Sequence, residues 1–127
     1  METATTTAQT TPENLSADLD GFIGTEHYYR YLIGTKLTDG TKFLADKAKA
    51  YWLMDAIASY QMYPNVRNMG IQFWTLTVKP NRSAKLELWD DIPGTRIKIQ
   101  TIPYTDFPLP KITLYCQDGV IFLPSEH

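Results

Sequence analysis

Apolar residues recur at helical spacing in the middle of the chain and at alternating positions towards its end. Residues 41–61 contain neither proline nor glycine, and four apolar side chains in this range fall on one helical face: Ala50, Leu53, Met54 and Ile57. Such a stripe is typical of a helix that buries one side. Pro64 ends the pattern, since proline cannot continue a helix. We therefore predict one main helix over about 41–61.

From residue 70 onward the chain carries five short runs rich in β-formers, separated by residues that favour turns. The runs are 71–78, 84–89, 95–102, 111–116 and 120–123. Asp118 and Gly119 separate the last two, and this pair favours a tight hairpin because both turn residues need positive φ. Residues 25–32 predict a further strand. We therefore expect an α+β fold, with the helix packed on one antiparallel sheet of five to six strands.

The composition fits one domain. The chain has 127 residues, of which 43% are hydrophobic and 20% charged, enough to build a core without disulfides. Residues 1–14 are rich in threonine and alanine and are expected to form a flexible tail, followed by a single domain over 15–127. No segment reaches the roughly 18 to 20 apolar residues of a membrane-spanning helix, and no early basic residue indicates a secretory signal.

Charge and ligand types exclude several function classes. The net charge of −2 gives no global basic field for nucleic acid. One cysteine and two histidines provide no disulfide framework and too few soft ligands for a zinc centre, so we expect neither metal nor cofactor. Cys116 shares a strand face with Ile112 and Leu114, which predicts a buried, unreactive thiol. A single free thiol favours the reducing cytoplasm.

Four sequence blocks resemble a known family. The blocks are GTEHYYR (24–30), AYWLMDAIA (50–58), YTDFPL (104–109) and DGVIFLPSE (118–126). In this order they resemble a small bacterial protein family of unknown function, whose members occur in cyanobacteria, in other bacteria and on mobile elements. The resemblance covers residues from about 20 to the end and implies one intact domain. It implies no activity, cofactor or catalytic residue.

His27 is the best candidate for acid–base chemistry, because imidazole titrates near neutral pH. Its neighbour Glu26 would point to the opposite face of a strand, so a partner must come from elsewhere, with Asp55 or Asp106 as candidates. Asp55 lies among apolar residues, where a carboxylate needs a hydrogen-bond partner such as a tyrosine hydroxyl, His27 or a backbone N–H. A structural role is favoured over catalysis for both His27 and Asp55.

The alternation of the strands predicts an outward sheet face with binding potential. If Leu86, Ile97, Ile99 and Leu114 point inward, a set of aromatic and basic residues points outward. The candidate binding residues are Trp89, Arg96, Lys98, Lys111 and Tyr115. Such a face could contact a protein, stack single-stranded bases, or stay solvated with charge pairs between Glu87 and Arg96 or Lys98.

Together these features favour a small non-enzymatic binding protein that contacts another protein or a second copy of itself. The aromatic content of 13% exceeds what one small core needs, and no convergent set of acid, base, nucleophile or ligand is evident. One concrete form, implied only by the resemblance, is a mobile-element inhibitor of a host defence complex, such as an anti-CRISPR protein. The alternatives are a single-strand nucleic-acid binder and a small enzyme with a His27/Asp55 pair. No membrane partner is expected.

Overall fold

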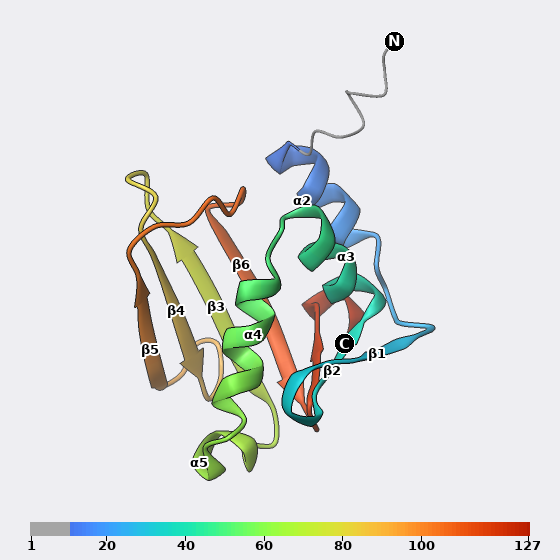
Figure 1. The fold of residues 1–127 in the computed structure, drawn as a ribbon, viewed down its shortest axis with the longest axis vertical. Coiled ribbons are helices and arrows are strands. Elements are labelled where there is room, and N and C mark those ends of the chain that lie inside the picture. The colour runs from blue at the N-terminus through green and yellow to red at the C-terminus, as the bar shows by residue number, and fades with distance from the viewer. Residues whose placement is uncertain (1–10) are drawn as a thin grey trace.

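The computed structural model of the protein describes residues 11–127, and these form an α+β fold with one seven-stranded sheet and four α-helices (Figure 1). The helices are α2 (Pro12–Asp20), α3 (Asp39–Lys47), α4 (Tyr51–Tyr60) and α5 (Pro64–Arg67), with short 3-10 turns at Leu32–Gly34 and Pro124–Glu126. The strands are β1 (Tyr28–Arg30), β2 (Lys36–Thr38), β3 (Gln72–Val78), β4 (Ala84–Trp89), β5 (Arg96–Ile102), β6 (Lys111–Gln117) and β7 (Val120–Phe122). The predicted α+β class is confirmed.

The sheet is mixed and has more strands than predicted. Its order is β1-β2-β7-β6-β3-β4-β5, and every neighbouring pair is antiparallel except β2 and β7, which run parallel. The expected antiparallel sheet of five to six strands is therefore wrong in detail. The missing strand is β2, three residues long, which lies in a segment without a strand-like alternation of its own. A parallel pairing between distant segments leaves no local sequence pattern.

The predicted single helix over 41–61 is two helices, α3 and α4. Lys49 breaks it by adopting a left-handed conformation with φ 52°. Around this residue the N–H of Ala50 donates to the carbonyl oxygen of Ala45 at 2.9 Å, and Ala48 donates to Leu44 at 2.9 Å. This is the way in which helices commonly end on a left-handed residue, although glycine usually occupies that place. With lysine there, the sequence gives no indication of the break.

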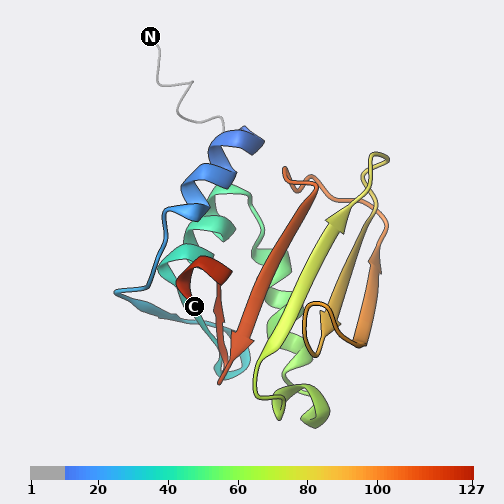
Figure 2. The ribbon, with the colours of Figure 1, turned by 180° about the vertical axis from the view of Figure 1, so that it is seen from behind.

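The helices cover one face of the sheet and leave the other open. Helices α3 and α4 lie on the same side, and the view from behind shows the opposite face of β6, β3, β4 and β5 without a covering helix among the described residues (Figures 1 and 2). The predicted helical stripe is fully buried: Ala50, Leu53, Met54 and Ile57. Strand residues including Trp74, Leu86, Leu88 and Leu114 pack in the same core. The predicted packing of the helical stripe on the sheet is confirmed.

Strand β5 has the opposite orientation to the one predicted. Lys98 pairs with the buried Leu88 and therefore faces the helices, whereas Ile99 pairs with Glu87 on the open side. Ile97 and Ile99 are exposed by 37% and 41%. A register shift beside Leu88 and Trp89 leaves Ile97 as the extra residue of a β-bulge. The expectation that both isoleucines point inward and that Lys98 points outward is wrong.

The N-terminal part of the domain begins with α2. Thr11 caps this helix by accepting a hydrogen bond from the backbone N–H of Asn14 at 3.1 Å. Residues 12–14 of the predicted tail thus belong to the helix, and residues 1–10 lie outside the described residues. Within 11–127, every helix is too short or too polar to cross a membrane.

Candidate functional site

The open side of β6, β3, β4 and β5, called the outer face below, carries a row of aromatic side chains across the strands. The backbone register places Tyr115 beside Phe73, and Phe73 beside Trp89. The rings of Phe73 and Tyr115 meet edge to face, with centroids 5.0 Å apart. All three side chains are half-buried, and the indole N–H of Trp89 donates to Thr75 Oγ1 at 3.0 Å. This row fixes flat apolar surface at the end of the outer face where β3 begins and β4 and β6 end.

His127 extends the row at its β7 end. Its ring stacks on Phe122, with centroids 5.6 Å apart, and meets Tyr115 edge to face at 5.7 Å. Phe122 is buried beneath this contact. The sequence pattern did not identify His127 as a binding residue, because its place on the sheet depends on the 3-10 turn that follows β7.

Basic residues lie at both ends of the outer face, with Arg96 next to Trp89 in the register. Arg96 pairs with Glu87, with Nη1 and Oε2 2.9 Å apart, which confirms the cross-strand pair predicted from the sequence. Lys85 and Lys111 flank Thr77, two rows beyond Phe73 on the same face, and have no ion-pair partner among residues 11–127. The outer face therefore has an aromatic end and, at the opposite end of the strands, a positively charged one.

Four of the five predicted binding residues lie together on this face: Trp89, Arg96, Lys111 and Tyr115. The exception is Lys98, whose Nζ lies 5.1 Å from the centre of the Tyr63 ring on the helix side. Ile97 and Ile99 take its place on the outer face. The sequence analysis placed both isoleucines on the helix side, because the apolar set of an alternating strand is expected to face the core, whereas β5 is an edge strand that is partly exposed on both sides.

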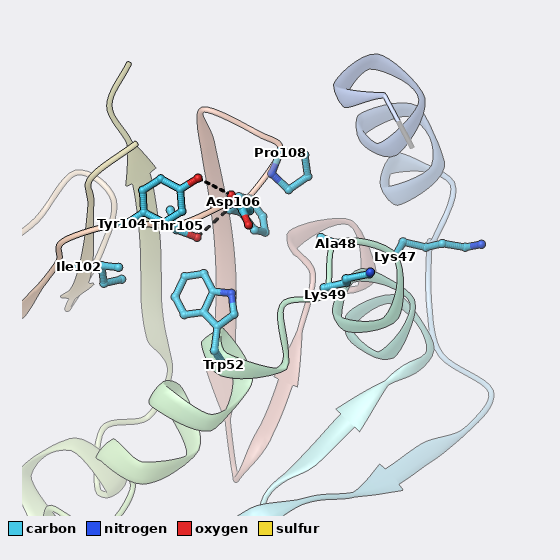
Figure 3. Close-up of a pocket in the computed structure, with 10 residues that line it drawn as sticks. Lys47, Ala48, Lys49, Trp52, Ile102, Tyr104, Thr105, Asp106 and Pro108 are labelled. Atoms are coloured by element: carbon cyan, nitrogen blue, oxygen red, sulfur yellow. Dashed lines mark hydrogen bonds between the residues drawn. The ribbon is translucent and has the colours of Figure 1, made fainter. Parts of the chain in front are cut away.

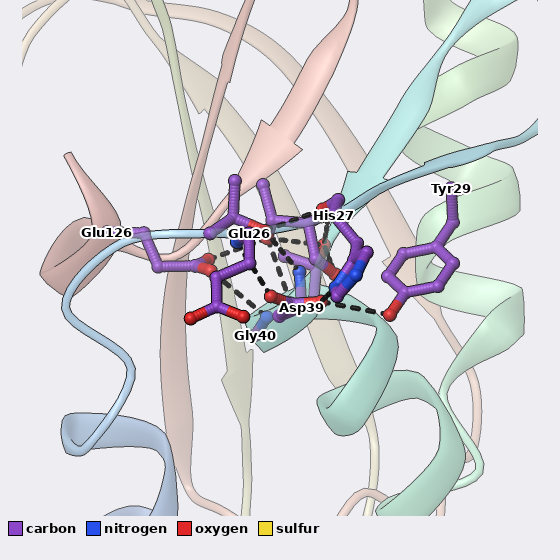
Figure 4. Close-up of polar contacts among 9 residues, drawn as sticks. Glu26, His27, Tyr29, Asp39, Gly40 and Glu126 are labelled. Atoms are coloured by element: carbon purple, nitrogen blue, oxygen red, sulfur yellow. Dashed lines mark hydrogen bonds and ion pairs between the residues drawn. The ribbon is translucent and has the colours of Figure 1, made fainter.

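The second candidate site contains His27, and the carboxylate beside this histidine is that of Asp39, not that of Asp55 (Figure 4). His27 Nδ1 lies 3.5 Å from Asp39 Oδ1, and the His27 side chain is 67% exposed. Asp55 instead accepts a hydrogen bond from the Tyr31 hydroxyl, and a tyrosine hydroxyl was one of the partners predicted for it. Asp106 accepts from the Tyr104 hydroxyl at 2.7 Å. The proposed His27/Asp55 pair is therefore wrong.

Asp39 is held in place by several donors. Its carboxylate accepts from the backbone N–H of Glu26 and from the Tyr29 hydroxyl, both at 2.9 Å. The hydrogen bond from Glu26, then that from Tyr29, holds the pKa of Asp39 below its usual value. A carboxylate of this kind is a poor proton acceptor, and the exposed His27 ring lies at the surface. The cluster thus has a structural role: its hydrogen bonds connect the start of β1 to α3, and this connection is called the joint below.

Glu126 completes the joint from the other end of the chain (Figure 4). Its Oε1 accepts from Thr38 Oγ1 at 2.6 Å and from the N–H of Leu123 at 2.9 Å, while Oε2 accepts from the N–H of Gly40 at 3.0 Å. A Cβ atom at Gly40 would come within 2.7 Å of Glu126, so glycine permits this close approach. Sequence reasoning missed Glu126, because its partners are 86 and 88 residues away.

The remaining chemically reactive groups are few. Cys116 is fully buried, and burial raises the pKa of its thiol to about 12, so the sulfur stays protonated. The predicted buried thiol is confirmed. Among residues 11–127, no three His, Cys, Asp or Glu side chains gather closely enough to hold a metal ion.

These features define a small α+β domain that exposes one side of a mixed sheet. The chain belongs to DUF6876, a family of unknown function, which matches residues 13–127. This confirms the resemblance to an uncharacterised family. Neither the curated proteins nor the solved structures contain a significant match.

Proposed function

We propose that the protein is a small non-enzymatic binding protein that contacts another protein through its outer face. The observation that carries this proposal is the row of Phe73, Trp89 and Tyr115 on a side of the sheet that no helix covers among residues 11–127. Aromatic side chains and arginine supply most of the binding energy in protein interfaces. The cross-strand contacts of these rings hold them in fixed positions, which lowers the entropy lost on binding.

The charge of the outer face indicates the chemistry of the partner. Lys85 and Lys111 are unpaired within 11–127, whereas the acidic Glu87 is neutralised by Arg96. A complementary surface would present an apolar patch opposite the aromatic row and carboxylates opposite the two lysines at the other end of the strands. An inhibitor of a host defence complex, such as an anti-CRISPR protein, is one form of this function, and its support is the resemblance to proteins of mobile elements. We place the function in the cytoplasm because the single cysteine is a free, buried thiol.

The side-chain partners in the structure do not support the catalytic alternative. It required His27 beside Asp55, and these residues have different partners. The partner of His27 is a carboxylate already engaged by two other donors.

The proposal is tested by capture from the native host, followed by reconstitution of any complex from purified components. We expect Trp89→Ala and Lys111→Glu to weaken the reconstituted complex at least tenfold, as truncation of an interface anchor does. Lys79→Glu is the matched control, since it makes the same charge change at an exposed position in the β3–β4 connection. Isothermal titration calorimetry measures the affinities, and thermal unfolding verifies that each variant is folded.

Two outcomes would contradict the proposal. One is a strictly monomeric protein with no recoverable partner; the other is a complex whose affinity neither outer-face substitution changes. A titration with labelled single-stranded DNA is run in parallel, because aromatic rings on a face that also carries basic residues can stack bases. Binding that weakens steeply with salt and is lost in Lys111→Glu would replace the protein partner by nucleic acid.

A further inference from the structure

A cavity of about 640 Å³ lies between the α3–α4 connection and the β5–β6 connection, away from the aromatic row of the outer face (Figure 3). Its apolar lining comes from Trp52 at the start of α4, Ile102 at the end of β5, and Phe107 and Pro108 beyond it. The volume lies within the range of about 300–1,000 Å³ typical of small-molecule sites, which are usually apolar with a few polar groups at the edge.

The loop that forms one wall of this cavity is held in place without a ligand. Arg82 Nε donates to the carbonyl oxygen of Thr105 at 3.0 Å, and its Nη2 donates to that of Phe107 at 2.6 Å. The backbone N–H of Thr105 donates in return to the carbonyl oxygen of Arg82 at 2.8 Å. The Phe107 side chain is buried in the core. A ligand would therefore find this wall already formed.

Lys49 lines the other wall, in a conformation that lysine rarely adopts. Its φ of 52° is the left-handed value that ends α3, a position where glycine is preferred. Strained residues of this kind often mark functional sites. Lys49 forms no ion pair or side-chain hydrogen bond within residues 11–127. Its ammonium group is therefore free to bind an anion at the cavity.

The charges around the cavity are unevenly placed. Asp106, which accepts the hydrogen bond from Tyr104, is on the loop wall, whereas Lys47 and Lys49 come from the end of α3. The Nζ atom of Lys47 lies 5.8 Å from the centre of the Phe43 ring, so of these two lysines Lys49 is the one without a partner within residues 11–127. An anionic ligand would direct its charge towards Lys49 and away from Asp106.

We propose that this cavity binds a small aromatic acid, with the ring packed against Trp52 and the carboxylate paired with the ammonium group of Lys49. Trp52 is half-buried and offers a large aromatic surface, on which a planar ring can stack. The pairing of a carboxylate with Lys49 is a charge-assisted hydrogen bond, the stronger kind in proteins. The site shares no residue with the protein-binding surface proposed above.

The test uses 2-naphthoate as the probe and two-dimensional ¹H–¹⁵N NMR of the full chain. The protein has three tryptophans, and each indole N–H gives a separate signal. We expect saturable shifts of the Trp52 indole signal and of the amides of residues 104–107. The indole N–H of Trp74 donates to Gln72 Oε1 at 3.0 Å in the core, and that of Trp89 donates to Thr75 on the outer face, so these two signals should stay in place.

Lys49→Gly separates binding from folding. Glycine suits the left-handed position, so the variant should be at least as stable as the original chain. Its affinity for 2-naphthoate should fall about tenfold, because the charge-assisted hydrogen bond is lost. Its affinity for the neutral 2-naphthol should not change. Lys79→Ala is the matched control, and it should bind 2-naphthoate like the original chain.

The proposal is overturned by any of three results. These are the absence of saturable shifts at Trp52, equal affinity for 2-naphthoate and 2-naphthol, and unchanged affinity in a folded Lys49→Gly variant.

Discussion

Asp39 shows how one side chain can organise a chain segment that lacks regular structure. Its carboxylate accepts hydrogen bonds from Glu26 and Tyr29, while its own backbone N–H donates to Thr25 Oγ1 at 2.8 Å. These bonds attach the approach to β1 to the first turn of α3. A carboxylate at this place also interacts favourably with the positive end of the helix dipole.

The effect of Asp39 on stability should depend on pH. Because its pKa is lowered in the folded state, the ionised form stabilises the fold at pH values above the usual aspartate pKa. This contribution is lost as the pH falls through the lowered pKa. We therefore expect Asp39→Asn to destabilise the protein at neutral pH, and the difference from the original chain to shrink as the solution becomes acidic.

Urea unfolding across a pH series measures this difference. Tyr29→Phe provides a comparison, because it removes one donor to the carboxylate and should reduce the pH dependence without abolishing it. A constant difference between Asp39→Asn and the original chain at every pH would show that the carboxylate charge has no part in stability.

At the level of elements, the sequence predicted best where side-chain alternation coincides with a fully buried face. In β4 and β6, the apolar positions Leu86, Leu88 and Leu114 point to the helices as expected. In β5 the same reasoning failed, because this strand lies at the sheet edge and both of its sides are partly exposed. The stem of Lys98 can lie along the Tyr63 ring, so a lysine was able to occupy the helix side.

The β5 register can be tested by placing a charge at Ile99. Because this side chain faces solvent, Ile99→Lys should change the free energy of unfolding by no more than about 0.5 kcal/mol. With the register expected from the sequence, the same lysine would enter the core and strongly destabilise the protein. Leu114→Ala serves as the reference for a buried site, with an expected loss of about 2–5 kcal/mol. Denaturant titration distinguishes these cases, and a large loss in Ile99→Lys would contradict the structure.

The candidate sites differ in how far local patterns could predict them. Trp89, Lys111 and Tyr115 were found because strand alternation alone determines their side of the sheet. The neighbours of His27 were not found, because they depend on the pairing of β1 with β2. The cavity beside Lys49 was missed because one of its walls is the connection between α3 and α4, which the sequence analysis did not predict. A glycine at position 49 would have indicated the end of α3, whereas lysine did not.

On the scale of the whole molecule, β7 joins two parts of the fold. It lies between β2 and β6, so the N-terminal hairpin of β1 and β2 reaches the rest of the sheet only through this three-residue strand. Only two residue pairs define the contact of β2 with β7. Glu126 strengthens the same joint from the side, through Thr38 and Gly40.

Removal of the Glu126 carboxylate should weaken this joint. Glu126→Ala removes the acceptor of the buried Gly40 and Leu123 N–H groups, at an expected loss of about 1–3 kcal/mol. The Thr38 hydroxyl loses its carboxylate partner and keeps only Thr41 Oγ1 at 3.1 Å. Native-state hydrogen exchange should show faster exchange in β1 and β2 than in β3, β4 and β6. Glu126→Gln keeps an acceptor oxygen and should lose less. Equal acceleration in every strand would argue against two separable parts.

The parallel contact of β2 with β7 also has a consequence for the order in which the chain can fold. Strands β3, β4 and β5, and likewise β6 and β7, are sequence neighbours that can pair after closing short loops. Strand β2 pairs with β7, which comes some 80 residues later in the chain. The hydrogen bond between Thr41 and Ile121, next to this strand pair, spans 80 residues. Closing so long a loop is entropically unfavourable and slow. Until it happens, β7 presents an open strand edge to the solvent, and it is at this stage that the chain is most exposed to aggregation.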